Sequence, residues 1–182
     1  MKHLGTKRME TDRLILRPFV KEDAEPMYRN WASDPEVTKF LTWSSYKSMD
    51  AAHKILEIWT KQYEDNTFYQ WAIELKERNE PIGSISVVKH DDRVELAHVG
   101  YCIGKTWWNQ GIVTEALSAV INYLFDEVEV QRIEALHDSN NPASGAVMRK
   151  CGMKFEGTLR RSQWCNQGVC DACYYALLKS ER

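Results

Sequence analysis

The segment 95–125 constrains the fold of this chain more than any other part of its sequence. It begins with an alternating pattern, continues through a polar and aromatic turn that ends at Gly111, and then repeats apolar residues at helical spacing. The repeat occupies Val113, Ala116, Leu117, Val120, Ile121 and Leu124. The pattern predicts a strand, a glycine turn and an amphipathic helix. Because the first N–H groups of a helix have no partner inside it, this turn predicts a site for a phosphate-bearing ligand.

Strands and helices are predicted on both sides of this segment. Strands are expected over 13–17, 68–76, 82–89, 94–103, 132–137, 154–165 and 169–179, and helices over 21–32, from 48 or 50 to about 63, over about 112–126 and over 141–152. The stretch 37–46 is aromatic and irregular. The three strands between 68 and 103 form an antiparallel meander, whereas the long crossover after them makes the next strand parallel. The sequence therefore predicts one mixed α/β domain over 1–182, which some schemes class as α+β.

Composition and charge exclude several classes of protein. The chain has 182 residues, 43% of them hydrophobic, and a formal net charge of −2. These values are typical of a globular domain and exclude a general attraction to nucleic acid or membranes. No apolar run is long enough to span a membrane, and the first residues show no apolar signal region, so a cytoplasmic location is expected. Neither a P-loop nor a G-x-G-x-x-G pattern is present.

Several short pieces of the sequence, taken in order, carry a resemblance to a known family. They are 10–17, 99–101, 108–116, 141–144, 150–153, and the closing hairpin with Asp171, Tyr174 and Tyr175. Together they resemble the GNAT superfamily of acetyl-CoA-dependent N-acetyltransferases, in the RimJ/RimL-like branch that acetylates the N-termini of ribosomal proteins. The resemblance covers nearly the whole chain. It implies a three-layer fold with about four helices and a mostly antiparallel seven-stranded sheet, in which a central parallel strand pair is splayed to hold CoA.

The resemblance also implies which residues hold acetyl-CoA. The family's pyrophosphate signature, Gln/Arg-x-x-Gly-x-Gly/Ala, falls on 108–113, where only Gly111 matches. A side chain is tolerated there because backbone N–H groups make the contacts. Three groups are implied: Tyr101, Cys102 and Ile103 for the pantetheine arm and the thioester carbonyl; Asn109, Gln110, Gly111, Ile112, Val113 and Thr114 for the pyrophosphate; and Asn141 with Ser144. The alternative interpretation is a glycine that only begins a packed helix, beside ordinary core residues.

Amine acetylation requires that the amine lose a proton, since a lysine-type ammonium has a pKa of about 10.4. The resemblance places His98 where relatives often have a glutamate base, and a histidine titrates near working pH. The alternative is a strand histidine on a solvated face. Glu95 is the second candidate, but three positions separate the two on a strand, so at most one faces the acetyl group unless a bulge intervenes. Water alone is a third route for the proton.

The leaving thiolate calls for a hydrogen-bond donor. Many members of the superfamily use a tyrosine in the last helix, and that position is Met148, which donates no proton. The RimL-like alternative is a serine near the start of this helix, which is Ser144. Ser144 and Asn141 also suit the cap of this helix, and the two roles are compatible.

The spacing Cys165-x4-Cys170-x2-Cys173 is similar to that of plant-type iron–sulfur ligands. These cysteines flank a hairpin turn, and that ligand set needs a fourth, distant cysteine. Cys102 and Cys151 lie in segments already assigned to the cofactor strand and a helix end. With five cysteines and no secretory signal, reduced thiols and no metal are expected.

The acceptor site is implied to lie between the first two helices and the closing hairpin, and aromatic residues there suit an apolar or cationic acceptor. These residues are Trp31, Phe40, Trp43, Tyr46 and Trp164, with Arg160 and Arg161 nearby; the alternative is that most of them build the core. The predicted function is an acyltransferase that moves acetyl from acetyl-CoA to a primary amine, of a protein N-terminus or a small molecule, by direct attack in a ternary complex. The protein would act as a monomer or homodimer. The alternative is a non-catalytic CoA-binding sensor or interaction module.

Overall fold

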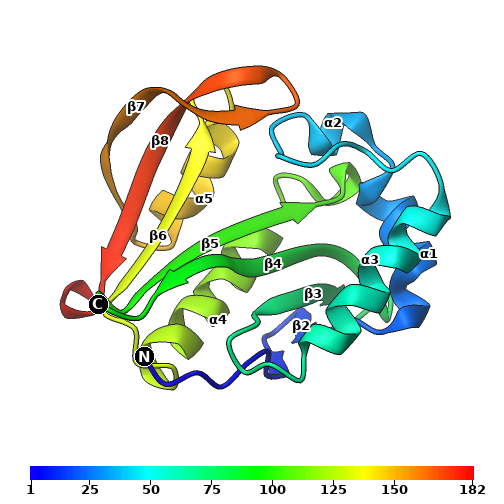
Figure 1. Cartoon of the computed structure of the whole chain (residues 1–182), viewed down its shortest axis with the longest axis horizontal. Helices are drawn as coiled ribbons and strands as arrows, with labels where there is room; N and C mark the ends of the chain where they lie inside the picture. The colour runs from blue at the N-terminus through cyan, green and yellow to red at the C-terminus, as the bar shows by residue number, and fades with distance from the viewer.

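A computed structural model describes residues 1–182, and its centre is one eight-stranded sheet (Figure 1). The strands follow the order β1-β2-β3-β4-β5-β6-β8-β7. Their bounds are β1 Met9–Glu10, β2 Leu14–Arg17, β3 Gln70–Leu75, β4 Glu80–Asp91, β5 Leu96–Ile103, β6 Arg132–Asp138, β7 Lys154–Cys165 and β8 Gly168–Leu178. Every neighbouring pair is antiparallel except β5 and β6. The predicted mixed α/β fold, with a mostly antiparallel sheet and one parallel pair, is confirmed.

Five α-helices accompany the sheet. They are α1 Ala24–Met27, α2 Pro35–Thr38, α3 Met49–Gln62, α4 Ile112–Asp126 and α5 Pro142–Lys150, with a π-helical turn Tyr28–Ala32 and 3-10 turns Lys21–Asp23, Lys105–Trp107 and Lys179–Glu181. The first predicted helix is thus a continuous segment of three helical types. The sequence did not predict β1 or α2. Both are too short to show a period, and α2 forms because Asp34 accepts a hydrogen bond from the Glu36 amide at 2.8 Å.

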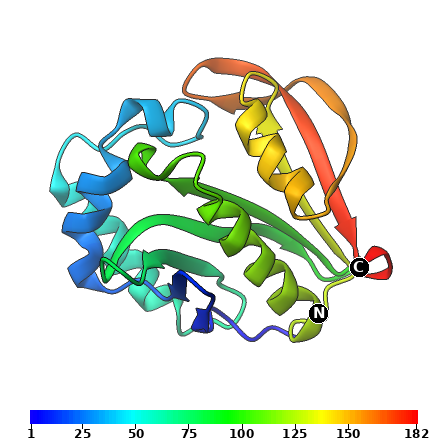
Figure 2. The same cartoon turned by 180° about the vertical axis from the view of Figure 1, so that it is seen from behind.

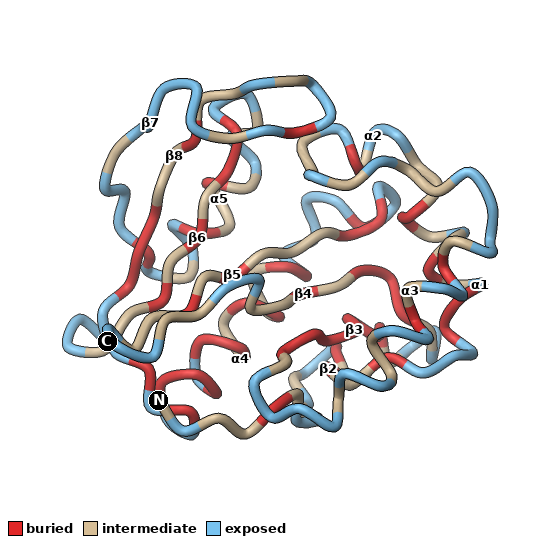
Figure 3. The backbone as a smooth tube through the Cα atoms, viewed as in Figure 1, coloured by how far each residue is buried: buried red, intermediate tan, exposed pale blue.

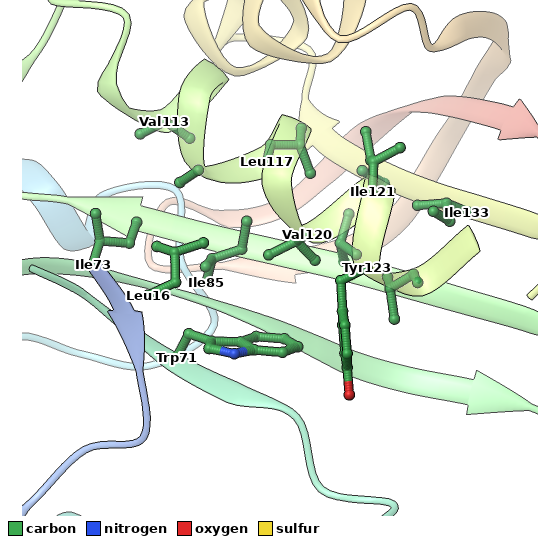
Figure 4. Packing of buried hydrophobic residues seen from close by; sticks show 14 of the residues in the cluster. Leu16, Trp71, Ile73, Ile85, Val113, Leu117, Val120, Ile121, Tyr123 and Ile133 are labelled. Atoms are coloured by element: carbon green, nitrogen blue, oxygen red, sulfur yellow. The ribbon is translucent and has the colours of Figure 1, made fainter. Parts of the chain in front are cut away.

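The helices form two layers, one on each face of the sheet (Figures 1 and 2). On one face, α4 buries the predicted apolar stripe against the strands, with Leu117, Val120 and Leu124 fully buried (Figure 4). Burial of each such side chain stabilises the fold by about 1.5–3 kcal/mol. On the other face, Trp31 and Leu56 belong to a second cluster that holds α1 and α3 against the sheet. Burial is concentrated where the helices meet the strands (Figure 3). None of the helices combines the length and apolar character that a membrane crossing requires.

The parallel pair β5–β6 is short, and this creates a fork in the sheet. Only Leu96↔Arg132, Ala97↔Ile133 and His98↔Glu134 are paired. Beyond this point β5 stays with β4 up to Ile103, while β6 stays with β8 up to Asp138, so the two strands diverge (Figure 1). The predicted splayed pair is therefore confirmed. The β5 backbone from 99 to 103 has no strand partner on the side of the fork.

Candidate active site

The turn before α4 forms one wall of the fork. Gly111 is the N-cap of α4 and has φ 73°, a left-handed conformation that favours glycine, and Asn109 has φ 60°, which asparagine tolerates. No side chain caps this helix. The first N–H groups of α4 are therefore available to an anion, and the positive end of the helix dipole favours negative charge there.

Residues from the turn between β1 and β2 brace the turn before α4. The Glu115 carboxylate accepts hydrogen bonds from Thr11 Oγ1 at 2.6 Å, from the Arg13 amide at 2.9 Å and from Arg13 Nε at 2.7 Å. Arg13 Nη1 also donates to the Gln110 carbonyl at 2.9 Å. Burial raises the pKa of Glu115, but the bonds from Thr11 and Arg13 outweigh it and keep that pKa below its ordinary value. The sequence analysis missed this brace, because its partners lie about a hundred residues apart.

A cavity of about 360 Å³, here the α4 cavity, opens between β5, this turn and α5. All the residues predicted to hold acetyl-CoA line it: Tyr101, Cys102, Ile103, Asn109, Gln110, Gly111, Ile112, Val113, Thr114, Asn141 and Ser144. The structure thus brings together three segments that are separate in the sequence. A backbone-lined turn at one end and an open strand edge at the other can hold an elongated ligand with an anionic end.

A hydrogen bond between Tyr101 and Ser144 closes one side of the α4 cavity. The Tyr101 hydroxyl lies 2.9 Å from Ser144 Oγ and donates to the Ser144 carbonyl at 3.0 Å, so it joins β5 to α5 across the fork. Burial raises the pKa of Tyr101 well above its ordinary value, which keeps the hydroxyl protonated near neutral pH. Asn141 is the N-cap of α5 but makes no side-chain capping bond. The Asn141 side-chain amide, and the Ser144 hydroxyl once it turns away from Tyr101, are the neutral donors that this side of the cavity offers to a ligand.

A second cavity of about 370 Å³, here the aromatic cavity, lies beside β4 and β5 on the side of α1 and α3. It is lined by Met27, Trp31, Ala32, Leu41, Thr42, Trp43, Tyr46, Ile55, Trp59, Gln70, Ser84, Ser86, Val88, Gly100, Tyr101 and Cys102, none of which is charged. Leu41, Tyr101 and Cys102 line both cavities. The two cavities are therefore neighbours that share part of their walls around the middle of β5.

The residues predicted to form the acceptor site do not all line the same cavity. Trp31, Trp43 and Tyr46 line the aromatic cavity, and Trp31 is fully buried as a core residue. Phe40 lines the α4 cavity instead. Trp164 is 61% exposed and lines neither cavity, and the exposed Arg160 and Arg161 are likewise outside both linings.

His98 and Glu95 lie outside the linings of both cavities. His98 Nδ1 is 3.1 Å from Glu134 Oε1, at the last pair before the fork. Alternation places it on the same face of β5 as Cys102, about 13 Å away at 3.3 Å per residue. Glu95 precedes β5 with φ 50°, and its carboxylate lies 3.5 Å from the amino group of Met1. Of the three predicted catalytic residues, the structure brings only Ser144 into a cavity.

The tip of the β7–β8 hairpin holds one wall of the aromatic cavity. The Asn166 amide donates to the Leu41 carbonyl at 3.0 Å, and Asn166 Nδ2 donates to the carbonyls of Thr38 and Trp43 at 2.8 and 2.7 Å. Ser44 Oγ lies 3.1 Å from Asn166 Oδ1. In the sequence, Asn166 is only a hairpin turn residue. Nothing in the local pattern signals contacts that span more than a hundred residues.

Comparison with known proteins places these features in a family. A family model described as "Acetyltransferase (GNAT) domain" matches residues 13–154. The "Uncharacterized N-acetyltransferase YoaA" of Bacillus subtilis (strain 168) is 30% identical over 171 residues, which cover 94% of this chain and 96% of that protein. The "Ribosomal-protein-serine acetyltransferase" of Escherichia coli (strain K12) is 30% identical over 98 residues, 54% of this chain and 55% of that protein. The solved structure of RimL, a ribosomal L7/L12 alpha-N-protein acetyltransferase in complex with coenzyme A, shares the fold, with a TM-score of 0.85 at 19% identity over 97% of this chain and all of that one.

Proposed function

Because this chain belongs to the GNAT acetyltransferase family and is an N-acetyltransferase, we propose that it moves the acetyl group of acetyl-CoA directly onto a primary amine bound in the aromatic cavity. The observation that carries the proposal is that Leu41, Tyr101 and Cys102 line both cavities. A thioester entering along β5 and an amine entering from the aromatic side would come together there. Direct transfer then needs no covalent intermediate on the protein.

In this proposal the α4 cavity binds acetyl-CoA. The uncapped N-terminus of α4, with Gly111 in its left-handed conformation, fits the pyrophosphate. The unpaired edge of β5 fits the amide-rich pantetheine arm, since amides can pair with a strand edge as another strand would. The same edge near Cys102 supplies N–H groups to a carbonyl oxygen that becomes an oxyanion during attack.

Ser144 is proposed to stabilise the leaving thiolate. Its hydroxyl lies at the fork beside Tyr101, which donates its one proton to the Ser144 carbonyl and accepts from Ser144 Oγ. During the reaction the serine proton would turn from Tyr101 to the sulfur, because a hydrogen bond to an anion is stronger than one to a neutral hydroxyl. The proposal needs no tyrosine at the position of Met148, which is buried in the core.

The aromatic cavity is proposed to favour the neutral form of the amine. Transfer of an ammonium from water into a cavity without charged side chains is unfavourable, so its pKa falls, although aromatic faces return part of that cost. The proton would then leave to water. Direct abstraction by His98 would require a relay across about 13 Å of strand, so desolvation is the better supported route.

The acceptor is proposed to be an amine attached to an apolar or aromatic group. A cavity with Trp43, Tyr46 and Trp59 but no carboxylate offers apolar surface and no partner for a second charge. A protein N-terminus with an apolar first residue and a small amine both meet this description. The likeness to a ribosomal-protein-serine acetyltransferase supports a protein N-terminus as the acceptor, although the serine in that protein's name is polar and does not support an apolar first residue.

The test is acetyl-CoA cleavage with a panel of amines that varies size, charge and apolar character. Apolar amines and N-terminal peptides should stimulate CoA release, and Trp43→Ala should raise the KM for the amine about tenfold or more by loss of aromatic contact. Trp164→Ala is the matched control, because this exposed tryptophan lines neither cavity. If CoA binds but no amine stimulates its release, the proposal fails.

A further inference from the structure

A buried cluster of metal-ligating side chains lies at the base of the β7–β8 hairpin tip, outside the linings of both cavities. Asp138 comes from β6, Cys165 from β7 and Cys170 from β8, and their ligand atoms all lie within 4.8 Å of one another. Cys165 is 2% exposed and Asp138 is 6% exposed, whereas Cys170 is half-buried. We propose that this cluster binds one Zn²⁺ ion through Asp138, Cys165 and Cys170, with water as the fourth ligand, and that the ion fixes the hairpin tip against the aromatic cavity.

The strand register favours a metal over a disulfide at this place. Cys165 lies opposite Gly168, and Cys170 lies opposite Gln163, so the two cysteines are diagonal neighbours. Diagonal residues are about 7–8 Å apart, beyond the usual Cα separation of a disulfide. A zinc ion holds two sulfurs about 3.8 Å apart through bonds of about 2.3 Å, so it needs no S–S bond and no shift in register.

The donor set suits zinc in kind and charge. Both ligand types bind Zn²⁺, which prefers sulfur and nitrogen but also accepts carboxylate oxygen. Without a metal, Cys165 Sγ donates to Asp138 Oδ2 at 3.4 Å. On binding, each cysteine forms a Zn–S bond and loses its thiol proton to solvent, while the carboxylate is already ionised. The site then carries a net charge of about −1, and two protons are released for each ion bound.

Neighbouring groups already orient two of the ligands. Asn140 donates from its amide at 2.8 Å and from Nδ2 at 3.1 Å to Asp138 Oδ1, which leaves Oδ2 directed at Cys165. The Gln167 amide donates to Cys165 Sγ at 3.4 Å, and such a bond stabilises a thiolate. Outer hydrogen bonds of this kind characterise metal sites, where they fix the direction of each ligand. The sequence analysis did not include Asp138, because it considered cysteines alone.

The cluster lies next to Asn166, which holds one wall of the aromatic cavity, so a bound ion would stabilise that wall. Cys165 directly precedes Asn166, whose hydrogen bonds hold the segment 38–44. An ion that fixes Cys165 would therefore also fix Asn166 and the wall of the aromatic cavity that carries Leu41 and Trp43. This consequence for the acceptor rests on the proposed function, whereas the binding of zinc does not.

The first test is a titration of the full chain with Co²⁺, which gives a thiolate-to-cobalt absorption band only when sulfur ligates it. The wild-type chain should show the band at one ion per chain, and Zn²⁺ should displace it. Cys165→Ser and Cys170→Ser should abolish the band, and Asp138→Asn should weaken binding at least tenfold. Cys173→Ser is the matched control, because Cys173 contacts Thr158 outside the cluster and should keep the band.

The readout is specific to this site. The surface cluster His3, His90 and Asp92 also offers ligands but contains no sulfur, so it gives no such band. Absence of the band in the wild-type chain overturns the proposal, whatever the variants do. A band that survives both cysteine substitutions, or that is lost in Cys173→Ser, also overturns it.

The second test separates the zinc site from the proposed function. The KM for the amine should rise at least fivefold when Zn²⁺ is removed with a chelator, while the Kd for CoA stays unchanged. If zinc binds but the KM does not change, the role of the ion at the aromatic cavity is wrong. If no amine is acetylated, the proposed function fails, and the cobalt titration still decides whether the site exists.

Discussion

His98 and Glu134 form the last pair of the parallel ladder, with Nδ1 and Oε1 3.1 Å apart, at the point where β5 and β6 separate. Glu134 also accepts from Arg132 Nε at 3.3 Å and Nη2 at 3.2 Å, so a small polar network closes the fork. The residue that the sequence nominates as a base thus holds a structural partner. This hydrogen bond lies where β5 and β6 separate, and residues of β5 beyond that point line both cavities.

His98→Ala should mainly affect stability. Loss of this half-buried hydrogen bond is expected to lower the free energy of unfolding by about 1–2 kcal/mol, and kcat should fall less than tenfold. Urea unfolding and steady-state kinetics measure the two effects separately. A loss of a hundredfold or more in kcat with unchanged stability would instead identify His98 as the general base.

Glu115→Gln should weaken CoA binding. The amide cannot serve as a charged acceptor for Thr11 and Arg13, so the turn before α4 loses its brace, and the Kd for CoA should rise about tenfold, equivalent to about 1.4 kcal/mol. Isothermal titration measures the change. Arg93→Ala is the control, because Arg93 pairs with Asp91 in an exposed turn. An equal loss in both variants would contradict a specific role for the brace.

The same carboxylate predicts a pH dependence. Because the pKa of Glu115 is lowered in the folded protein, its contribution to stability is present above its unfolded pKa, about 4.3, and is lost as pH falls through its folded pKa. CoA affinity in the wild-type chain should therefore weaken as the pH falls through the lowered pKa of this carboxyl. In Glu115→Gln this acid loss should be smaller. Identical profiles for the two proteins would show that another group titrates.

Gly145→Ala should disturb α5. A Cβ at this position would lie 2.5 Å from Nε2 of His137, a buried atom without a hydrogen-bond partner. Relief of that contact requires α5 to move, which should cost about 1–3 kcal/mol of stability and displace Ser144. Thermal unfolding and kcat report the two effects. The double variant His137→Ala/Gly145→Ala makes room for the methyl group and should recover stability relative to the sum of the single changes.

Asn166→Ala should raise the KM for the amine about tenfold and leave the Kd for CoA unchanged. The substitution removes the side-chain bonds to Thr38, Trp43 and Ser44, so one wall of the aromatic cavity is released. Gln167→Ala, at the next position of the same turn, is the control. If both Kd and KM change together, the hairpin tip supports the whole fork and not the acceptor side alone.

The sequence predicted the elements with strong periodicity and missed those that depend on distant contacts. The stripe on α4 and the alternation around β5 set their bounds closely, and Gly111 marked the start of α4. By contrast, the two residues of β1 and the four of α2 are too short to carry a period. The brace at Glu115 and the bonds of Asn166 join positions more than a hundred residues apart, which no local pattern encodes.

The candidate site divides in the same way. The residues predicted to bind the cofactor lie in continuous segments with recognisable composition, and the structure gathers them around one cavity. His98 was predicted as a base from its residue type and its position in the strand. Whether its side chain reaches a cavity depends instead on where β5 and β6 separate. That point is set by the pairing of two strands.

The fork leaves an unpaired strand edge in the middle of the sheet. Exposed edges readily recruit strands from other chains, and the outer edges of natural sheets are usually protected for this reason. Here protection would come from a ligand that pairs with residues 99–103. Bound acetyl-CoA would then stabilise the folded state and protect this edge, in addition to its part in the reaction. Without it, the protein should show faster amide exchange along this edge and a greater tendency to self-associate.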